Sequence, residues 1–409
     1  MEINAIYEGD NLEILSKFSN KSVDLIYADP PFYTNKGFEI IWKDEAEKRA
    51  FEDRWAGGIE HYITWMEPRL RECQRVLKDT GSVYLHCDPH ANAHLRILMD
   101  KIFGEKNFKS EIIWSIETAS GFKTQANKWI RGHDTILFYT KSKKYIFNKQ
   151  LLPYDERTIR RYDKIDSKGR HYKIYNERGQ QRIVYLDESK GRPMTDVWTD
   201  IIGFQTVQKK GEYLGYPTQK PLSLLERIIN ASSKENDIVL DPFCGCGTTL
   251  VAAQKLNRKW IGIDISPTAC KLMQKRLRKQ FSINAQLVRG EVDLNYIKKL
   301  HPFEFQNWVV VDKFLGKVSD KKIGDMGIDG FTPQVSGGYP IQVKQSEGIG
   351  RNVIDNFETA MRRISKAKGY IVAYSFGKGA IEEVARAKNQ EGLDITLRTV
   401  QELLEGKTD

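Results

Sequence analysis

The sequence lacks the features of membrane-spanning and secreted proteins. No run of about 18 apolar residues occurs along the chain, so we expect no transmembrane helix. The first ten residues, MEINAIYEGD, carry neither a basic start nor an apolar segment, which argues against a signal peptide. The five cysteines are scattered and form no Cys-x-x-Cys pair. We therefore predict a reducing, cytoplasmic location and no structural zinc site.

The chain also lacks internal repeats and low-complexity tracts, and its length exceeds that of an ordinary single core. With 409 residues, of which 40% are hydrophobic and 11% aromatic, it is predicted to fold into two or three globular domains. We place a boundary near residue 299, which separates a domain over 1–298 from a smaller one over 299–409.

Excess negative charge is absent, and the positive excess is localised. The net charge is +10, and residues 123–220 hold 21 Lys and Arg against 11 Asp and Glu, whereas residues 301–409 hold 15 of each. Aromatic residues interleave with the basic ones (Tyr154, Tyr162, Tyr172, Tyr175, Tyr185 and Trp198). Cations neutralise phosphates and flat rings stack on bases, so the segment favours nucleic acid as a partner. A plain solvated surface is the alternative.

Apolar runs and helical spacing alternate along most of the chain. We predict strands at 22–29, 82–87, 111–114, 134–140, 237–241 and 260–265, and helices at 60–78, 91–102, 221–235, 248–256 and 266–280. This alternation indicates an α/β sheet. The stretch 150–215 is polar, basic and aromatic without clear periodicity, which is typical of a functional insertion.

A glycine-rich turn lies between a strand and a helix. DPFCGCGTT (241–249) follows the strand at 237–241, and Gly245 and Gly247 allow a tight turn with close backbone approach to a ligand. The next strand ends at Asp264, whose carboxylate can accept hydrogen bonds from ribose hydroxyls. The set favours a nucleoside cofactor, whereas a triphosphate loop, GxxxxGK[ST], is missing. We interpret Cys244 and Cys246 as small buried residues, not metal ligands.

A second motif, Asp29-Pro30-Pro31-Phe32, follows the strand at 22–29. The prolines fix the backbone and remove N–H donors, which leaves a carboxylate, a carbonyl and an aromatic ring. The two oxygens could each accept one N–H of a planar amine while Phe32 stacks on the ring that carries it, aiming the nitrogen lone pair at a methyl donor. A base would have to flip out of a duplex to reach them. The alternative is a strand stopped by two prolines.

These motifs, in this order, resemble those of the amino-group DNA methyltransferases of the permuted beta class. The resemblance covers about residues 5–280 and rests on YADPPF, GSVYLHCDPHANAHLRILMDKIFG (81–104), HDTILFYTKSKKYIFN (133–148), YPTQKPLSLLERII and DIVLDPFCGCGTT. It implies an S-adenosylmethionine-dependent, Rossmann-like α/β domain with a permuted seven-stranded sheet. It also implies that 150–215 is the target-recognition insert, where the charge excess makes sense.

The resemblance assigns roles to individual residues. The catalytic residues would be Asp29, Pro30, Pro31 and Phe32, and the cofactor-binding residues Asp10, Lys220, Asp241, Phe243, Gly245, Gly247, Thr248 and Asp264. The Asp of DPPF favours the adenine amine, although the same chemistry serves the 4-amino group of cytosine. His86, Cys87, Asp88 and His90 would form a strand end beside the target-binding region, not a metal site.

The C-terminal segment resembles a different family, the Mrr-type restriction endonucleases. GDMGIDG (324–330) is followed by YPIQVKQ (339–345), a strand that carries Gln342 and Lys344 on one face. The resemblance implies a small α/β nuclease-like fold in which Glu304, Asp329 and Gln342 hold Mg2+ and Lys344 orients the attacking water. The alternatives are an exposed strand with a solvated lysine, or a domain that has lost cleavage.

Taken together, the motifs predict a site-specific DNA methyltransferase of a restriction-modification system that acts on double-stranded DNA. Cleavage by the C-terminal domain remains an open expectation, and a homodimer is compatible with the sequence. A protein that binds DNA without turnover is the competing hypothesis, against which the intact DPPF motif argues.

Overall fold

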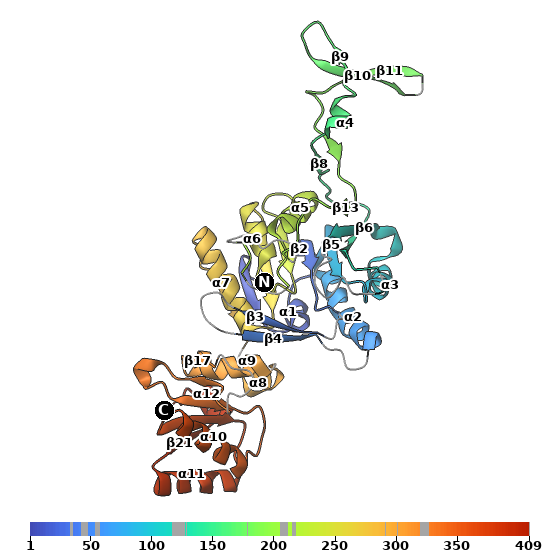
Figure 1. The fold of residues 1–409 in the computed structure, drawn as a ribbon. Coiled ribbons are helices and arrows are strands. Elements are labelled where there is room, and N and C mark those ends of the chain that lie inside the picture. Colours follow the sequence, from blue (N-terminus) through green and yellow to red (C-terminus); the bar gives the residue numbers. More distant parts are fainter. Residues whose placement is uncertain are drawn as a thin grey trace.

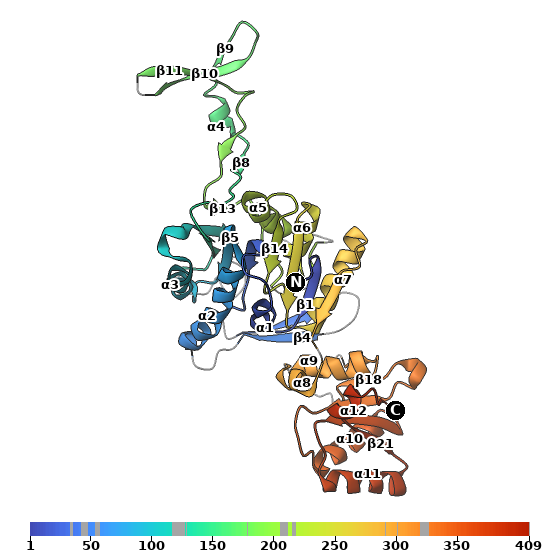
Figure 2. The ribbon, with the colours of Figure 1, turned by 180° about the vertical axis from the view of Figure 1, so that it is seen from behind.

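A computed structural model of the chain has three parts, which Figures 1 and 2 present from opposite sides: a central α/β domain, a narrow arm and a C-terminal domain. The residues described are 1–32, 36–41, 48–53, 58–116, 127, 129–177, 179–204, 212–214, 218–290, 292–300, 302–319 and 327–408. The arm and the C-terminal domain lie on opposite sides of the central domain in both views.

The central domain is built on a nine-stranded sheet with the order β13-β6-β7-β5-β2-β14-β15-β1-β16. The strands are β1 (Ala5–Glu8), β2 (Val23–Ala28), β5 (Leu77–Cys87), β6 (Phe108–Ser115), β7 (His133–Thr140), β13 (Val197–Trp198), β14 (Ile238–Asp241), β15 (Lys259–Asp264) and β16 (Gln286–Arg289). All neighbours are parallel except β7, which is antiparallel to β5 and β6.

The predicted count of seven strands is wrong for this sheet, although every strand predicted from the sequence is confirmed. Three strands lie beyond the six predicted from the residues: β1, and the edge strands β13, paired with β6, and β16, paired with β1. The two edge strands are short, and their pairing satisfies backbone N–H and C=O groups that would otherwise be exposed at the sheet margin.

Helices cover both faces of the sheet: α1 (Asn11–Ser16), α2 (Gly58–Val76) and α3 (Asn92–Phe103) on one face, and α5 (Leu222–Ser232), α6 (Thr248–Lys255) and α7 (Pro267–Phe281) on the other. Strand β2 has all six residues buried, with Ile26 in one cluster and Leu25 and Tyr27 in the other. The two-residue period of a strand divides its apolar side chains between the two cores.

The two ends of the strands form two distinct edges of the domain. Because β1, β2, β14 and β15 are parallel, their carboxyl ends meet at one edge. Strand β7 runs the other way and ends at the opposite edge. There Asn148 donates hydrogen bonds to backbone oxygens at the end of α5, from its backbone to Ala231 (2.6 Å) and from its side chain to Asn230 (2.8 Å) and Ser233 (3.0 Å).

The arm, defined as residues 149–196, leaves the domain at this opposite edge (Figure 1). It contains a two-stranded pair, β8 (Leu151–Leu152) with β12 (Arg192–Pro193), the short α4 (Glu156–Ile159), and a three-stranded antiparallel sheet of β9 (Lys164–Ile165), β10 (His171–Glu177) and β11 (Gln180–Tyr185). The segment expected to be irregular is therefore partly ordered as small antiparallel sheets. A separate two-stranded hairpin, outside the arm, pairs β3 (Lys36–Ile41) with β4 (Lys48–Asp53).

The C-terminal domain holds a five-stranded sheet in sequence order: β17 (Lys317–Val318), β18 (Gly330–Phe331), β19 (Pro340–Val343), β20 (Lys368–Ala373) and β21 (Asp394–Thr399). The first three strands are antiparallel and the last three parallel. Its helices are α8 (Leu294–Lys299), α9 (Pro302–Asn307), α10 (Arg351–Arg363), α11 (Lys378–Glu391) and α12 (Val400–Leu404), with a π-helical turn at Trp308–Lys313.

Helix α8 packs with this domain. Ile297 and Leu300 belong to the same hydrophobic cluster as Phe305, Trp308 and Val400. The hydrophobic core of the C-terminal domain thus begins ahead of residue 299.

Among the described helices, none is long and apolar enough to cross a membrane.

Candidate functional site

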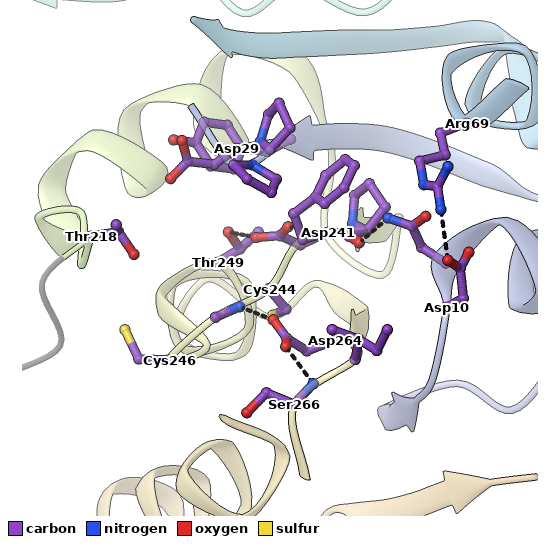
Figure 3. Close-up of a pocket in the computed structure, with 18 of the residues that line it drawn as sticks. Asp10, Asp29, Arg69, Thr218, Asp241, Cys244, Cys246, Thr249, Asp264 and Ser266 are labelled. Atoms are coloured by element: carbon purple, nitrogen blue, oxygen red, sulfur yellow. Dashed lines mark hydrogen bonds and ion pairs between the residues drawn. The ribbon is translucent and has the colours of Figure 1, made fainter. Parts of the chain in front are cut away.

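A cavity of about 480 Å3 opens at the carboxyl edge of the central sheet (Figure 3). Strand ends and the loops after them line it, because parallel strands bring their carboxyl ends together. The predicted residues that line the cavity are Asp10, Asp29, Pro30, Pro31, Phe32, Lys220, Asp241, Phe243, Gly245, Thr248 and Asp264. One cavity thus collects almost the whole set predicted from motifs that lie more than 200 residues apart in the sequence.

Asp264 lies where the sequence predicted an acceptor for ribose hydroxyls. Its two carboxylate oxygens accept hydrogen bonds from the backbone N–H groups of Gly245 (2.7 Å) and Ser266 (2.9 Å), as Figure 3 shows. Burial raises its pKa to about 6, against the opposing effect of these two hydrogen bonds. The carboxylate is half-buried at the cavity wall, so it can accept further hydrogen bonds from a bound ligand.

Asp241 contributes differently from the prediction. Its carboxylate accepts hydrogen bonds from the backbone of Phe243 (3.0 Å) and the hydroxyl of Thr249, so both oxygens already hold the loop that follows β14. Burial raises its pKa to about 7. We conclude that Asp241 shapes the cavity floor by organising the glycine loop.

The two glycines of this loop have different tasks. Gly245 lines the cavity and has a φ of 51°, whereas Gly247 does not line it. Gly247 begins helix α6 with a φ of 77°, and a Cβ atom there would lie 2.7 Å from Cγ of Met273. In the structure this position permits the turn and the close packing of α7; a contact between Gly247 and the cofactor stays a prediction.

Thr248 and Cys246 anchor the far side of the loop. The Arg276 guanidinium donates hydrogen bonds to the Thr248 hydroxyl and the Cys246 carbonyl, each 3.1 Å. Cys244 and Cys246 are buried and free, as interpreted from the sequence.

Asp10 is fixed by a cation that the sequence did not indicate. Its carboxylate caps helix α1 by accepting from the Leu12 backbone (2.8 Å) and pairs with the Arg69 guanidinium (2.6 Å). Arg69 also lies over the Trp65 ring, 3.9 Å from its centre. Helix α2 therefore contributes Trp65 and Arg69 to the cavity. The side-chain oxygen of neighbouring Asn11 is buried without a hydrogen-bond partner among the described residues.

Asp29, the predicted catalytic carboxylate, is held by Lys220. The Lys220 ammonium is paired with Oδ2 of Asp29 and lies 5.1 Å from the centre of the Phe32 ring. Oδ1 of Asp29 is buried and has no hydrogen-bond partner among the described residues. A buried carboxylate oxygen without a partner costs free energy unless a donor completes it, so this atom is a natural acceptor for a ligand N–H group. Lys220 was predicted for the cofactor; in the structure its contact is to Asp29.

A buried chain of polar side chains lies behind this site and was not foreseen. The Tyr27 hydroxyl contacts Nδ1 of His86 (2.9 Å), and Nε2 of His86 contacts Asp134 (3.1 Å). Burial opposes ionisation of Asp134, but the His86 hydrogen bond and the charges of Arg131 and Lys220 outweigh it and hold the pKa of this carboxyl well below its usual range. The His86 ring centre is also 5.7 Å from that of Phe32.

His86 was predicted only as part of a strand end beside the target-binding region. The partners of this chain lie 59 and 48 residues from His86, which no local motif indicates. The neighbouring Asp88 instead holds the turn that precedes α3, where its carboxylate accepts hydrogen bonds from the backbones of His90 and Ala91, each 3.0 Å.

Glu304, which was predicted to complete the nuclease site, lies at the cavity of the central domain instead. Its carboxylate accepts hydrogen bonds from the hydroxyls of Ser266 (2.6 Å) and Thr268 (3.5 Å), and it lines the cavity. On the same helix, the Gln306 amide donates to the backbone oxygen of Asp329 (2.8 Å). Residues two apart on a helix face different sides, so α9 directs Glu304 away from Asp329.

Asp329 and Gln342 do come together. The β18–β19 register pairs Gly330 with Ile341, which sets Asp329 opposite Gln342 with both side chains on one face. Oδ2 of Asp329 accepts from the Val343 backbone (2.7 Å), and the Gln342 side-chain oxygen is buried without a hydrogen-bond partner among the described residues. Lys344 follows on the same side of the strand and is half-buried.

Comparison with known proteins gives consistent results for the central domain. Residues 23–275 match the profile of a family described as "DNA methylase". The type II methyltransferase M.EcaI of Enterobacter cloacae is 31% identical over 67% of this chain and 69% of its own length. The DNA adenine methyltransferase YhdJ of Escherichia coli (strain K12) is 32% identical over 68% of this chain and 83% of its own length.

Solved structures with a similar fold include M1.HpyAVI in complex with S-adenosylmethionine, with 22% identity and a TM-score of 0.42, covering 67% of this chain and 98% of that one. Another is the PvuII DNA methyltransferase, cytosine-N4-specific, with 16% identity and a TM-score of 0.44, covering 69% of this chain and 93% of that one. On the profile match over more than half of its length, and on the identity to curated relatives, this chain belongs to the DNA methylase family and is a DNA methyltransferase.

Proposed function

We propose that the chain transfers a methyl group from S-adenosylmethionine to the exocyclic amine of adenine in double-stranded DNA, as the modification enzyme of a restriction-modification system. The observation that carries the proposal is the unpartnered, buried Oδ1 of Asp29 in the same cavity as the half-buried carboxylate of Asp264. One atom suits an amine N–H, and the other suits the hydroxyls of a nucleoside.

The residues of the cavity fit the cofactor. Asp264 faces the cavity with acceptor capacity beyond its two backbone hydrogen bonds, and Gly245 has no side chain between the loop and a ligand. Trp65 and Phe243, whose ring centres are 6.0 Å apart, add aromatic surface suited to an adenine ring. S-adenosylmethionine, when bound, supplies an electrophilic methyl group.

The chain then prepares the amine for attack. Oδ1 of Asp29 and the Pro30 carbonyl each accept one N–H of the amine, while Phe32 stacks on the flipped base. Lys220 holds Oδ2 and so fixes the carboxylate in place. Two fixed acceptors draw the nitrogen towards tetrahedral geometry and direct its lone pair into the cavity, where the methyl carbon would lie. The amine nitrogen gains the methyl group as the bond between the methyl carbon and the sulfonium sulfur breaks, which leaves a neutral thioether, and the nitrogen then gives up one proton to water.

Adenine is favoured over the 4-amino group of cytosine by the Asp of the DPPF motif, and a relative at 32% identity is named a DNA adenine methyltransferase. The order of the motifs, with Asp29 after β2 and ahead of the glycine loop after β14, supports our proposal that the chain is of the permuted beta class. We also place the boundary between the two domains near residue 290, ahead of α8.

The test is to incubate the full chain with duplex DNA and S-adenosylmethionine carrying a labelled methyl group, and then to digest the DNA to nucleosides. We expect the label in N6-methyladenine. Label in N4-methylcytosine would overturn the choice of base, and label in added RNA or protein would overturn the choice of substrate. Tight, salt-sensitive DNA binding without turnover on any sequence would favour the competing hypothesis of a binding module.

A second candidate function is Mg2+-dependent DNA cleavage by the C-terminal domain. The buried, unpartnered Gln342 oxygen beside Asp329 supports it, because Mg2+ prefers such oxygen ligands. Lys344 would orient the attacking water. The two domains would then carry protecting and cutting activities in one chain. Failure to cut, in the presence of Mg2+, unmethylated DNA that the chain does methylate would contradict cleavage.

We further propose that the arm binds DNA. Tyr175 on β10 is exposed, and Lys173 lies 4.9 Å from its ring centre, so a base or a phosphate could reach both side chains. Because the root of the arm is at the edge opposite the cavity, this placement favours a role in affinity over direct contact with the flipped base.

A further inference from the structure

The cavity of the methyltransferase domain has one wall from outside that domain. Lys299, Leu300 and Glu304 line it, and they come from the end of α8 and from α9 of the C-terminal domain. Leu300 is only 5% exposed and belongs to the hydrophobic core of the C-terminal domain. That core therefore supports the wall directly.

A chain of hydrogen bonds joins this wall to the proposed ribose acceptor. The Gly245 and Ser266 backbones donate to Asp264, and the Ser266 hydroxyl donates to Oε1 of Glu304 (2.6 Å). Ser266 is almost fully buried and also caps the start of α7 by accepting from Ala269 (3.1 Å). Ser266 is therefore held in place, and its hydroxyl keeps the Glu304 carboxylate beside Asp264.

Further contacts between the two domains, among the residues that the structure describes, are polar as well. The Tyr296 hydroxyl donates to the buried Glu8 (3.2 Å), Lys299 pairs with Glu13 (3.1 Å), and Lys271 pairs with Asp312. Each hydrophobic cluster of the described residues lies within one domain. The two ion pairs are largely exposed and contribute little, so the docking rests mainly on the Tyr296–Glu8 and Ser266–Glu304 hydrogen bonds.

We propose that the C-terminal domain completes the S-adenosylmethionine site through Leu300 and Glu304, so that cofactor binding and domain docking are linked. The inference rests on the proposed function, which assigns this cavity to S-adenosylmethionine. A ligand that contacts both domains favours the docked state by its difference in affinity for the docked and undocked states. Weakening the docking contacts therefore weakens cofactor binding to the extent that it lowers the fraction of chains in the docked state.

The experiment uses the full chain and two independent readouts. Titration calorimetry measures the Kd for S-adenosylmethionine of the unmodified chain and of the variants Glu304→Gln, Leu300→Ala and Glu382→Gln. Hydrogen–deuterium exchange measures the protection of residues 294–307 with and without S-adenosylmethionine. Glu382 lies on α11, exposed and away from the cavity, and is the matched control for a Glu-to-Gln change.

We expect Glu304→Gln and Leu300→Ala each to raise the Kd about five- to tenfold, because the first turns one acceptor oxygen of the wall into an N–H donor group and the second removes a buried contact. The cofactor should slow exchange over 294–307 in the unmodified chain, and less so in Glu304→Gln. Glu382→Gln should match the unmodified chain in both readouts.

If Glu304→Gln binds within twofold of the unmodified chain and the cofactor leaves exchange over 294–307 unchanged, the linkage is overturned. Because Glu304→Gln keeps shape and size, it tests the linkage even where Leu300→Ala fails to fold. An unmodified chain that binds no S-adenosylmethionine would instead contradict the proposed function, which separates the two failures.

Discussion

The sequence predicted two sets of active-site residues, one in the central domain and one in the C-terminal domain, and the fold brings only the first set together at one site. In the cavity, Asp10, Asp29, Asp241 and Asp264 all follow the carboxyl ends of neighbouring parallel strands and meet at one edge. In the C-terminal domain, Asp329 and Gln342 meet on paired strands, but Glu304, on a helix, lies at the cavity of the other domain.

The difference has a physical cause. Strand pairing and the two-residue period fix which side chains share a face, so a motif on strands predicts its own geometry. The rotation of a helix about its axis depends on what the helix packs against, which no short motif specifies. Site residues on strand ends are therefore predicted more securely than those on helices.

Removing the Asp29 carboxylate, the proposed hydrogen-bond acceptor for the amine, should give the largest effect. Asp29→Ala is expected to lower the rate of methyl transfer by at least about a hundredfold, because it removes a fixed hydrogen-bond acceptor used in the transition state. The Kd for S-adenosylmethionine should change little, since Asp29 contacts the amine. Single-turnover methylation and calorimetry measure the two quantities. Equal loss of both would mean that Asp29 belongs to the cofactor site.

Two variants test the contrast between strand and helix in the C-terminal domain. If the domain cleaves DNA, Asp329→Ala should abolish Mg2+-dependent cutting and leave methylation intact, whereas Glu304→Gln should keep cutting. Gel assays on unmethylated plasmid with Mg2+ or with EDTA measure this. Loss of cutting in Glu304→Gln, with unchanged cofactor binding, would show that Glu304 acts in the nuclease site, as the sequence predicted.

The partner of Asp29 should matter less than Asp29 itself. Lys220→Met leaves the Asp29 carboxylate in place without its ion pair, and we expect a roughly tenfold lower rate of transfer. The Kd for S-adenosylmethionine should stay within about threefold, because losing the ion pair removes no contact that the proposal gives to the cofactor. A larger change in Kd than in rate would support the role first predicted for Lys220, closing the cofactor site.

Cofactor affinity should depend on pH through Asp264. Its pKa is raised to about 6 by burial, and only the ionised carboxylate accepts both ribose hydroxyls. Affinity should therefore fall as pH drops below 6, by up to about tenfold per pH unit. Asp264→Asn should bind more weakly at neutral pH and lose this step in the pH profile. Asp241, with a pKa of about 7, is a second group that titrates nearby. The informative result is therefore the disappearance of the step near pH 6 in Asp264→Asn.

The same shift affects stability with a definite sign. A carboxyl whose pKa is higher in the folded than in the unfolded chain stabilises the fold at low pH, and this contribution is lost as pH rises from about 4 to about 6. Asp264→Asn removes this pH-dependent term but also loses one of the two backbone hydrogen bonds at every pH. The sign is therefore read from thermal unfolding of the cofactor-free chain at pH 5 and pH 7.5: relative to the unmodified chain, the variant should be less destabilised at pH 7.5 than at pH 5, and the reverse order would contradict the sign.

The sequence predicts the central sheet well because its strands are continuous apolar runs. Strand β2 is an example: all six residues are buried, and the run ends at Asp29-Pro30. Strands β13 and β16 escaped prediction because two to four residues with polar neighbours carry no periodic signal, and only the exposed edge of the sheet makes them strands.

The interior of the site was predicted only in part. Arg69 and the Tyr27–His86–Asp134 chain depend on contacts between residues 48 to 59 positions apart, which become visible only in the folded chain. The direction of the arm was equally inaccessible, because it depends on β7 running antiparallel to its neighbours. The sequence predicted a target-recognition insert at 150–215; in the structure the arm, residues 149–196, is rooted at the edge opposite the cavity (Figure 1).

The arm gives the last and smallest expected effect. The arm, residues 149–196, holds 12 Lys and Arg against 8 Asp and Glu, so most of the positive excess of 123–220 lies outside the arm. Part of the arm charge is also paired internally, as between Arg170 and both Asp187 and Glu188. Each phosphate contact that is lost should lower the slope of log affinity against log salt by about one.

We therefore expect the variant with Arg160, Lys164 and Lys173 changed to Gln to bind DNA a few-fold more weakly at about 0.1 M salt, with a salt slope reduced by no more than about three. The rate of transfer at saturating DNA should not change, because the arm is rooted at the edge away from Asp29. Fluorescence anisotropy over a salt series and single-turnover methylation measure the two effects. An unchanged slope would remove the arm from the DNA interface, and a lower saturated rate would show that it acts on the flipped base after all.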